Sequence, residues 1–251
     1  MNRSLAILFL VPLLAGCPVI QPQDTPVSAR KLRELDTGRK YWLYVPSNYS
    51  TDRDWPLVVT LHGSHGWDNS RSQIMEWKHL AEEKGFIVVA PDLKCTQGIL
   101  PVIRSLWLAD LESDERAILE ILDELTVEYK IDPKTVLLTG FSAGGYPLFY
   151  VGLRHPDKFH MLIARGANSD LELLESIEVT DRARELPIVI FWGKDEILKI
   201  QKDSWQAYRF LRERRFFNTR RKEIRGGHLR RPEMAYRFWS EQLPERHRPM
   251  N

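Results

Sequence analysis

Two kinds of apolar pattern alternate along the chain. In the first kind, five short stretches are almost wholly apolar and rich in β-branched residues, as in strands buried on both faces of a sheet. These stretches are residues 56–62, 86–91, 135–140, 161–164 and 187–192. In the second kind, apolar residues recur every three or four positions, as on the buried face of a helix. The predicted helices are residues 70–84, 112–130, 143–155, 201–215 and 231–242.

The alternation of strands and helices predicts an α/β fold with a mainly parallel central sheet and helices on both faces. Residues 32–36 and 40–46 flank Thr37-Gly38-Arg39 and predict a hairpin before the first of the buried strands. Active sites in such sheets lie beyond the carboxyl ends of the strands. The segments that follow the strands are therefore where chemistry is expected.

The first sixteen residues predict a signal peptide that is not part of the domain. Arg3 precedes an uncharged run, residues 5–15, which is too short to cross a hydrocarbon layer of roughly 30 Å but suits a signal peptide. The run ends in LAGC, residues 14–17, which resembles the lipobox of bacterial lipoproteins. This resemblance implies a lipid on Cys17 that anchors the exported protein to a membrane of the bacterial cell envelope. The alternative is an ordinary secretory signal followed by an incidental cysteine.

Residues 17–30 contain three prolines and no apolar periodicity, which predicts an extended tether. No repeat and no second linker interrupts residues 31–251, so they are expected to form one domain.

Net charge and cysteine content argue against nucleic-acid partners, a disulfide scaffold and a zinc site with several thiolate ligands. The chain has 36 Lys and Arg against 34 Asp and Glu, and a net charge of +2 gives no reason to expect nucleic-acid binding. The two cysteines, Cys17 and Cys95, are too few for a disulfide scaffold or for a zinc site built on several thiolates.

A glycine-rich turn follows the predicted strand 135–140. Its sequence, GFSAGG at residues 140–145, contains G-x-S-x-G between a strand and a helix. In this context the serine occupies a strained turn that lifts its hydroxyl above the sheet, and the glycines let strand and helix pass without Cβ clashes. A phosphate-binding loop of the Walker kind would need a lysine before the Ser or Thr, and the turn has none. We therefore predict that Ser142 is a catalytic nucleophile.

With this turn, the chain resembles the α/β-hydrolase superfamily, and within it the esterases related to polyhydroxybutyrate depolymerases and feruloyl esterases. The resemblance extends from the hairpin to the last predicted helix. It implies an α/β-hydrolase catalytic domain over residues 31–251, without a large lid domain, and a triad in the order serine, acid, histidine. It also implies cleavage of carboxylic esters through an acyl-enzyme, with no metal and no organic cofactor.

The triad acid is expected directly after the strand 187–192, where Gly193-Lys194-Asp195-Glu196 follows. We predict that Asp195 is this acid. The similar esterases often have G-x-x-D here, whereas the first acid of this chain comes one residue earlier. Glu196 therefore remains an alternative.

The triad base is predicted to be His228, because Gly226 and Gly227 before it let the loop bring the ring inward. The similar esterases have a Gly-Gly-His segment at this point. Five other histidines lie at a helix end, inside a helix, in the tail or before the nucleophile in the chain.

Attack on an ester places negative charge on the former carbonyl oxygen, and two backbone N–H groups are expected to stabilise it. One is predicted to come from Ala143, directly after the nucleophile. The other should come from the loop after the strand 56–62, His62-Gly63-Ser64-His65. In the similar hydrolases the donor commonly follows His-Gly, which implies Ser64, and His65 is the alternative.

These predictions describe an exported, lipid-anchored serine esterase. The alternatives are a serine peptidase of the prolyl-oligopeptidase type and a non-catalytic binding protein on the same fold.

Trp67 and residues 99–108 could line an acyl pocket. Residues 209–231 carry ten Lys and Arg against two Glu and could meet anionic lipid or an anionic substrate. The motifs fit polyester, hydroxycinnamoyl, acetylated sugar and simple lipid esters equally well, and they do not determine the oligomeric state.

Overall fold

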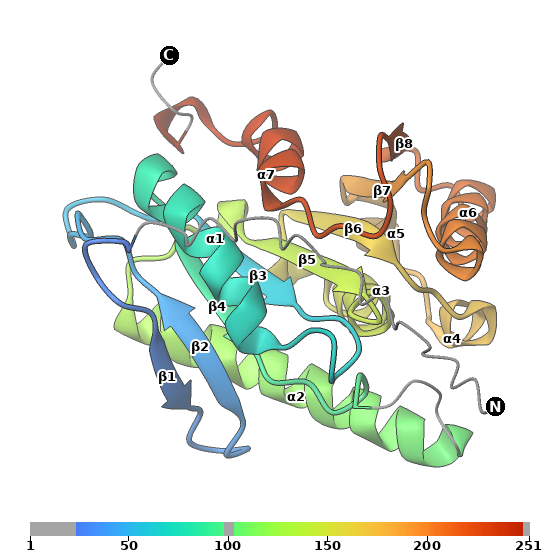
Figure 1. Cartoon of the computed structure of the whole chain (residues 1–251), viewed down its shortest axis with the longest axis horizontal. Helices are drawn as coiled ribbons and strands as arrows, with labels where there is room; N and C mark the ends of the chain where they lie inside the picture. Colours follow the sequence, from blue (N-terminus) through green and yellow to red (C-terminus); the bar gives the residue numbers. More distant parts are fainter. Residues whose placement is uncertain (1–23, 98–102, 248–251) are drawn as a thin grey trace, which may run out of the picture.

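The computed structural model describes residues 24–97 and 103–247. The predicted signal peptide, Cys17 and the first half of the predicted tether lie outside the described residues. The described chain folds around an eight-stranded sheet with the order β1-β2-β4-β3-β5-β6-β7-β8 (Figure 1).

The sheet is mainly parallel, as the alternation of strands and helices predicts. The first two strands form the predicted hairpin, the second pairs antiparallel with β4, and all pairs from β4 to β8 are parallel. The strands are β1 Arg30–Arg33, β2 Lys40–Tyr44, β3 Leu57–Leu61, β4 Ile87–Pro91, β5 Leu137–Ser142, β6 Met161–Ala167, β7 Ile188–Gly193 and β8 Thr219–Ile224.

Helices cover both faces of the sheet, because the residues of each buried strand alternate between two hydrophobic cores. Val58 belongs to a core cluster that includes residues of α1 and α7, whereas Val59 belongs to the cluster on the other face, which includes residues of α2, α3 and α6. The helices are α1 Ser70–Lys84, α2 Arg104–Glu128, α3 Gly145–Arg154, α4 Leu171–Ser176, α5 Asp181–Glu185, α6 Leu198–Glu213 and α7 Pro232–Ser240.

Helix α2 begins eight residues earlier than its apolar periodicity predicts, at Arg104 instead of residue 112. Tertiary contacts hold this additional length. Arg104 pairs with Asp170 at 2.9 Å, and Trp107 packs edge-on against Tyr146 of α3. Contacts with distant residues therefore extend a helix beyond the range that the local pattern supports.

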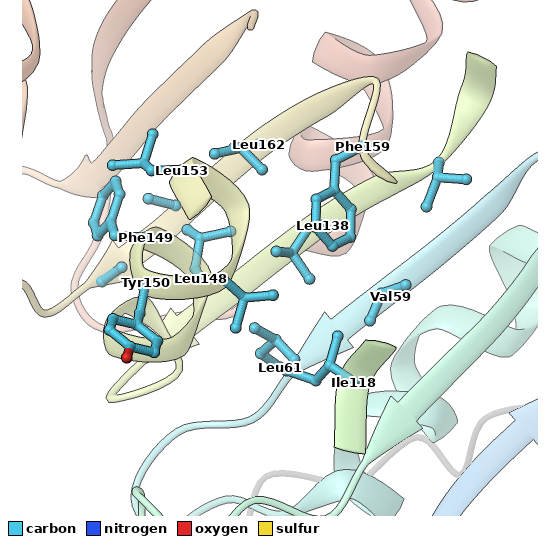
Figure 2. Close-up of a cluster of buried hydrophobic side chains, with 14 of the residues drawn as sticks. Val59, Leu61, Ile118, Leu138, Leu148, Phe149, Tyr150, Leu153, Phe159 and Leu162 are labelled. Atoms are coloured by element: carbon cyan, nitrogen blue, oxygen red, sulfur yellow. The ribbon is translucent and has the colours of Figure 1, made fainter. Parts of the chain in front are cut away.

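The core under α3 fixes the position of the segment that follows Ser142. Figure 2 shows Leu148 and Leu153 of this helix facing Leu138 of β5 and Leu162 of β6. The helix lies close to the sheet because residue 152 is a glycine, where a Cβ would come within 2.6 Å of the Leu162 side chain. Close packing on buried leucines thus holds α3, and with it the turn at Ser142, firmly against the sheet.

A fully buried arginine, Arg165 of β6, lies beneath the carboxyl edge of the sheet. Its Nε donates to the Thr139 hydroxyl at 3.0 Å, and one Nη donates to the Thr60 hydroxyl at 2.9 Å and to Gln73 Oε1 at 2.7 Å. The other Nη donates to the carbonyl oxygen of Arg230 at 3.1 Å. Burial lowers the pKa of Arg165 to about 10, so the guanidinium stays charged at neutral pH.

We expect Arg165→Ala to lower the free energy of unfolding by about 3–5 kcal/mol, because it leaves a large cavity and takes the donor from the Arg230 carbonyl. Urea unfolding would measure the loss. The matched control is Arg182→Ala on the surface, which removes half-exposed ion pairs and should change stability by no more than about 0.5 kcal/mol. Equal unfolding midpoints for the two variants would contradict this structural role.

Candidate active site

Ser142 ends β5 at a sharp turn into α3. Its φ of 52° lies in the left-handed region, which costs a non-glycine residue about 1–2 kcal/mol. The backbone passes very close to itself at this turn. A Cβ at Gly140 would lie 2.3 Å from the Gly144 carbonyl oxygen, and a Cβ at Gly144 would lie 2.5 Å from that of Leu61. Both glycines of G-x-S-x-G are therefore required, as the motif implies.

Ser142 lines a cavity of about 510 Å³, together with His228 and the predicted oxyanion residue Ser64. The structure thus brings to one place three residues that are far apart in the sequence. Trp67 also lines this cavity, as predicted, and is largely exposed. In contrast, residues 99–102 of the predicted pocket segment lie outside the described residues. Ile103 caps α2, residues 104–108 form its start, and none of these six lines the cavity.

The carboxylate that lies beside His228 belongs to Glu196, the alternative acid, and not to the predicted Asp195. His228 Nδ1 lies 2.8 Å from Glu196 Oε1, and the Glu196 side chain is 1% exposed. Asp195 is exposed. The reason is the tight turn after β7, in which the N–H of Glu196 bonds back to the Gly193 carbonyl at 3.2 Å. This turn places residue 195 at its tip and directs residue 196 back into the fold.

Gly166 of β6 makes room for this carboxylate. Its φ is 48°, and a Cβ there would lie 2.8 Å from Glu196 Oε2 and 3.4 Å from His228 Nδ1. No motif in the sequence marks this position. The need for a glycine at position 166 is apparent only in the structure, where β6 and the turn after β7 lie side by side.

The His228 ring stacks on Phe141, the residue before Ser142, with ring centroids 4.5 Å apart. Its Nδ1 is close to Glu196, but the N–H is not aligned with a carboxylate oxygen as a hydrogen bond. Catalytic hydrogen bonds often have such geometry before a substrate binds, and they tighten in the reacting complex. The stacking on Phe141 thus sets the plane of the ring, and Glu196 lies against its Nδ1 side.

The loop after β3 is held by a buried, neutral His62. Its Nε2 accepts from the Leu93 N–H at 2.9 Å, so Nδ1 carries the proton and donates to the Gly63 carbonyl at 2.8 Å. Burial lowers the pKa of His62, which favours this neutral form. His62 is not a base for Ser142 in this arrangement, but it fixes the backbone that precedes Ser64.

Hydrogen bonding in the same loop distinguishes Ser64 from His65, the two candidates for the second oxyanion donor. The His65 N–H donates to the Thr96 carbonyl at 2.8 Å and is therefore occupied. In the described part of the chain, no acceptor bonds the N–H of Ser64 or of Ala143. Gly63 lies beside the nucleophile, since a Cβ there would be 3.0 Å from Ser142 Cβ. The arrangement thus favours Ser64 over His65.

Asp68 holds this loop from the other side, and sequence reasoning did not single it out. It is buried, and its Oδ2 accepts from the Gly63 N–H and from Gln73 Nε2, both at 2.7 Å. Its Oδ1 lies 3.2 Å from Arg230, two residues after the predicted base. Asp68 therefore links the loop after β3 to the loop that carries His228.

Two further predictions concern cysteine and metal chemistry. Cys95 is buried, and burial raises the pKa of its thiol well above the usual range, so it remains a packed thiol. Among residues 24–97 and 103–247, no group of three or more His, Cys, Asp and Glu side chains could hold a metal ion. Within the same residues, no helix is long and apolar enough to cross a membrane.

Curated proteins with related sequences are much longer than this chain. The chain is 35% identical over 113 residues to a bifunctional acetylxylan esterase/xylanase of Neocallimastix patriciarum, a match that covers 45% of this chain and 16% of that protein. It is 25% identical over 160 residues to dipeptidyl-peptidase 5 of Porphyromonas gingivalis, covering 59% of this chain and 22% of that protein. The chain thus spans less than a quarter of the length of either relative.

Solved structures share the fold. A CE1 ferulic acid esterase from Anaeromyces mucronatus in complex with ferulic acid superposes with a TM-score of 0.63 at 18% identity, over 86% of this chain and 89% of that one. A thermostable esterase gives a TM-score of 0.62 at 22% identity, over 86% of this chain and 62% of that one. The predicted α/β-hydrolase fold is thereby confirmed.

The family model BD-FAE matches residues 43–204, which is more than half of the chain. The match includes the turn at Ser142, the loop of Ser64 and the acidic turn of Glu196. By this match, the chain belongs to the BD-FAE family.

Proposed function

We propose that this chain is a serine hydrolase that cleaves carboxylic esters through an acyl-enzyme. The observation that carries the proposal is the strained Ser142 in one cavity with His228, whose Nδ1 side lies against the buried carboxylate of Glu196. A serine hydroxyl reacts poorly until a base takes its proton, and the base works best when an acid orients it. The membership of the BD-FAE family and the likeness to esterases support the choice of esters.

In the proposed reaction, Ser142 Oγ attacks the ester carbonyl carbon while His228 Nε2 accepts its proton. Glu196 keeps the Nδ1 proton in place and stabilises the imidazolium that forms. The oxygen that becomes negative is held by the N–H groups of Ser64 and Ala143. His228 then protonates the leaving alcohol, and a water activated by the same ring hydrolyses the acyl-enzyme.

A peptidase is the second candidate, because the chain is also similar to dipeptidyl-peptidase 5. Labelling by a fluorophosphonate would separate either hydrolase from a binding protein on the same fold. Turnover of 4-nitrophenyl acyl esters without turnover of dipeptidyl anilides would support the esterase, and the reverse pattern would support the peptidase.

Ser142 and His228 should act as one unit. We expect Ser142→Ala, His228→Ala and the double variant to have about equally low ester turnover, because each group is ineffective without the other. Steady-state kinetics with 4-nitrophenyl acetate would test this, with circular dichroism as a check of folding. Losses that multiply in the double variant, or an active Ser142→Ala, would refute the assignment.

The two adjacent acids provide a matched pair of variants. Glu196→Gln should lower kcat by about 10⁴-fold, by analogy with the loss of the orienting acid in a known triad. Asp195→Asn should change kcat by less than about threefold, since its side chain is exposed at the tip of the turn. The opposite result would return the role to Asp195.

We also propose that the exported protein is anchored by a lipid on Cys17, because LAGC follows the apolar run directly. Wild-type protein made in a bacterial host should enter the detergent phase of a phase-separation assay. Cys17→Ser should remain unprocessed or enter the aqueous phase, whereas the control Cys95→Ser should behave as wild type. Wild-type protein recovered unlipidated and cleaved elsewhere would contradict the proposal.

A further inference from the structure

A basic surface lies at the end of the sheet farthest from β1, and the proposed reaction does not use it. Residues 209–220 form this surface where α6 ends and β8 begins (Figure 1). They carry five arginines against a single acid, Glu213. We call residues 209–220 the arginine turn. Its arginines, all of them exposed, are Arg209, Arg212, Arg214, Arg215 and Arg220.

Neighbouring acids neutralise only part of this charge. Glu213 pairs with one of the five arginines, and Glu241 after α7 pairs with another. Helix α5 lies beside the arginine turn, and its two acids pair with arginines of α5 itself. Within residues 24–97 and 103–247, Arg212, Arg214 and Arg215 form no ion pair with a carboxylate. The arginine turn therefore keeps a net positive charge.

Arg215 occupies a backbone position that favours glycine. Its φ is 68°, in the left-handed region, and it directly follows the last residue of the α6 cap. The Phe216 N–H bonds to the Leu211 carbonyl at 3.0 Å, and the Arg215 N–H bonds to the Arg212 carbonyl at 3.2 Å. These two bonds define a Schellman motif, whose left-handed residue is usually glycine. Helix α1 of the same chain follows this rule, since it ends at Gly85 with a φ of 73°.

No contact within the described chain accounts for an arginine at position 215. Its side chain is exposed and has no hydrogen bond, ion pair or ring contact with residues 24–97 or 103–247. Backbone strain that no internal contact repays is typical of positions kept for a function. Beside it, Phe217 is 70% exposed, and its ring lies 5.8 Å from the Arg212 guanidinium. An exposed phenyl ring among arginines is typical of surfaces that lie on a membrane.

The arginine turn and the catalytic cavity lie at opposite edges of the sheet. Strands β5 to β8 are parallel, and Ser142 ends β5, whereas Thr219 begins β8. The cavity therefore opens at the carboxyl edge, and the arginine turn lies at the amino edge. A substrate held at Ser142 is remote from the arginine turn, which favours lipid over an anionic substrate as the partner of these arginines.

We propose that the arginine turn docks the domain on an anionic lipid bilayer. Arg214 and Arg215 meet the phosphates of the headgroups, and the Phe217 ring enters the boundary between headgroups and acyl chains. A lipid on Cys17 would hold Asp24, the first described residue, within about 25 Å of the same bilayer, so that docking occurs within one anchored molecule. Docking at the amino edge leaves the catalytic cavity open to substrates in water.

The test uses residues 17–251 with Cys17→Ser, a chain that carries no lipid and keeps every described residue. Co-sedimentation measures its binding to vesicles of phosphatidylcholine with or without phosphatidylglycerol. We expect binding to be at least about tenfold tighter when phosphatidylglycerol is present, and the difference to disappear at about 0.5 M salt. Vesicles should leave turnover of 4-nitrophenyl acetate unchanged, because the docked cavity faces water.

Arg215→Gly separates docking from stability. It should weaken binding to the anionic vesicles by about fivefold, because one cation is lost. It should also raise the melting temperature by about 2 °C, because glycine relieves the strain at this φ. Phe217→Ser should weaken binding by about threefold or more, because the apolar contact is lost. The matched control Arg33→Ala removes one exposed cation from β1, at the far end of the sheet, and should bind as the parent chain does.

Equal vesicle binding by the parent chain and Arg215→Gly would overturn the proposal. So would an equal loss in Arg33→Ala, which would show an effect of net charge alone. A lower melting temperature of Arg215→Gly would show that Arg215 serves the fold instead. Binding to heparin without binding to anionic vesicles would identify a polysaccharide partner and overturn the lipid assignment. Vesicle binding is measured without turnover, so a failure of the proposed ester hydrolysis would leave this test intact.

Discussion

The arrangement of the site depends on one buried cation, Arg165, which has no carboxylate within hydrogen-bonding distance among the described residues. Arg165 bonds Thr139 on the strand that ends at Ser142, Thr60 on the strand that leads to the loop of Ser64, and the carbonyl oxygen of Arg230, two residues after His228. A buried charge is costly unless its donors are satisfied, so these groups must keep their positions for the guanidinium to remain where it is. One side chain thereby holds three separate segments of the chain in register with one another.

The features that local patterns predict correctly are those that local physics determines. Continuous apolar stretches predict the buried strands, and the G-x-S-x-G turn predicts the strained Ser142, because a Cβ at either glycine would collide with backbone. The helix expected to begin at residue 112 begins earlier, since its first turns depend on Asp170 and Tyr146, which are distant in the sequence. Local periodicity contains no information about such partners.

Sequence reasoning could not decide between adjacent residues. Asp195 and Glu196 are equally acidic, and only the bond from Glu196 N–H to the Gly193 carbonyl decides which of them faces inward. Ser64 and His65 differ in the same way, because the Thr96 carbonyl occupies one of the two N–H groups. Gly166 and Asp68 carry no sequence signal, since each acts on a residue that the fold brings near. Roles that depend on turn geometry or on tertiary neighbours therefore need the structure.

The neutral tautomer of His62 has a consequence for the response of the protein to acid. This ring can accept from the Leu93 N–H only while Nε2 is free of a proton, and folding favours that state because burial lowers the pKa of His62. A second proton on His62 would break the bond to Leu93 and place a charge in the interior. The folded loop therefore loses stability as the pH falls below the range in which an unfolded histidine titrates. His62 therefore supports the folded loop of Ser64 only in its neutral form.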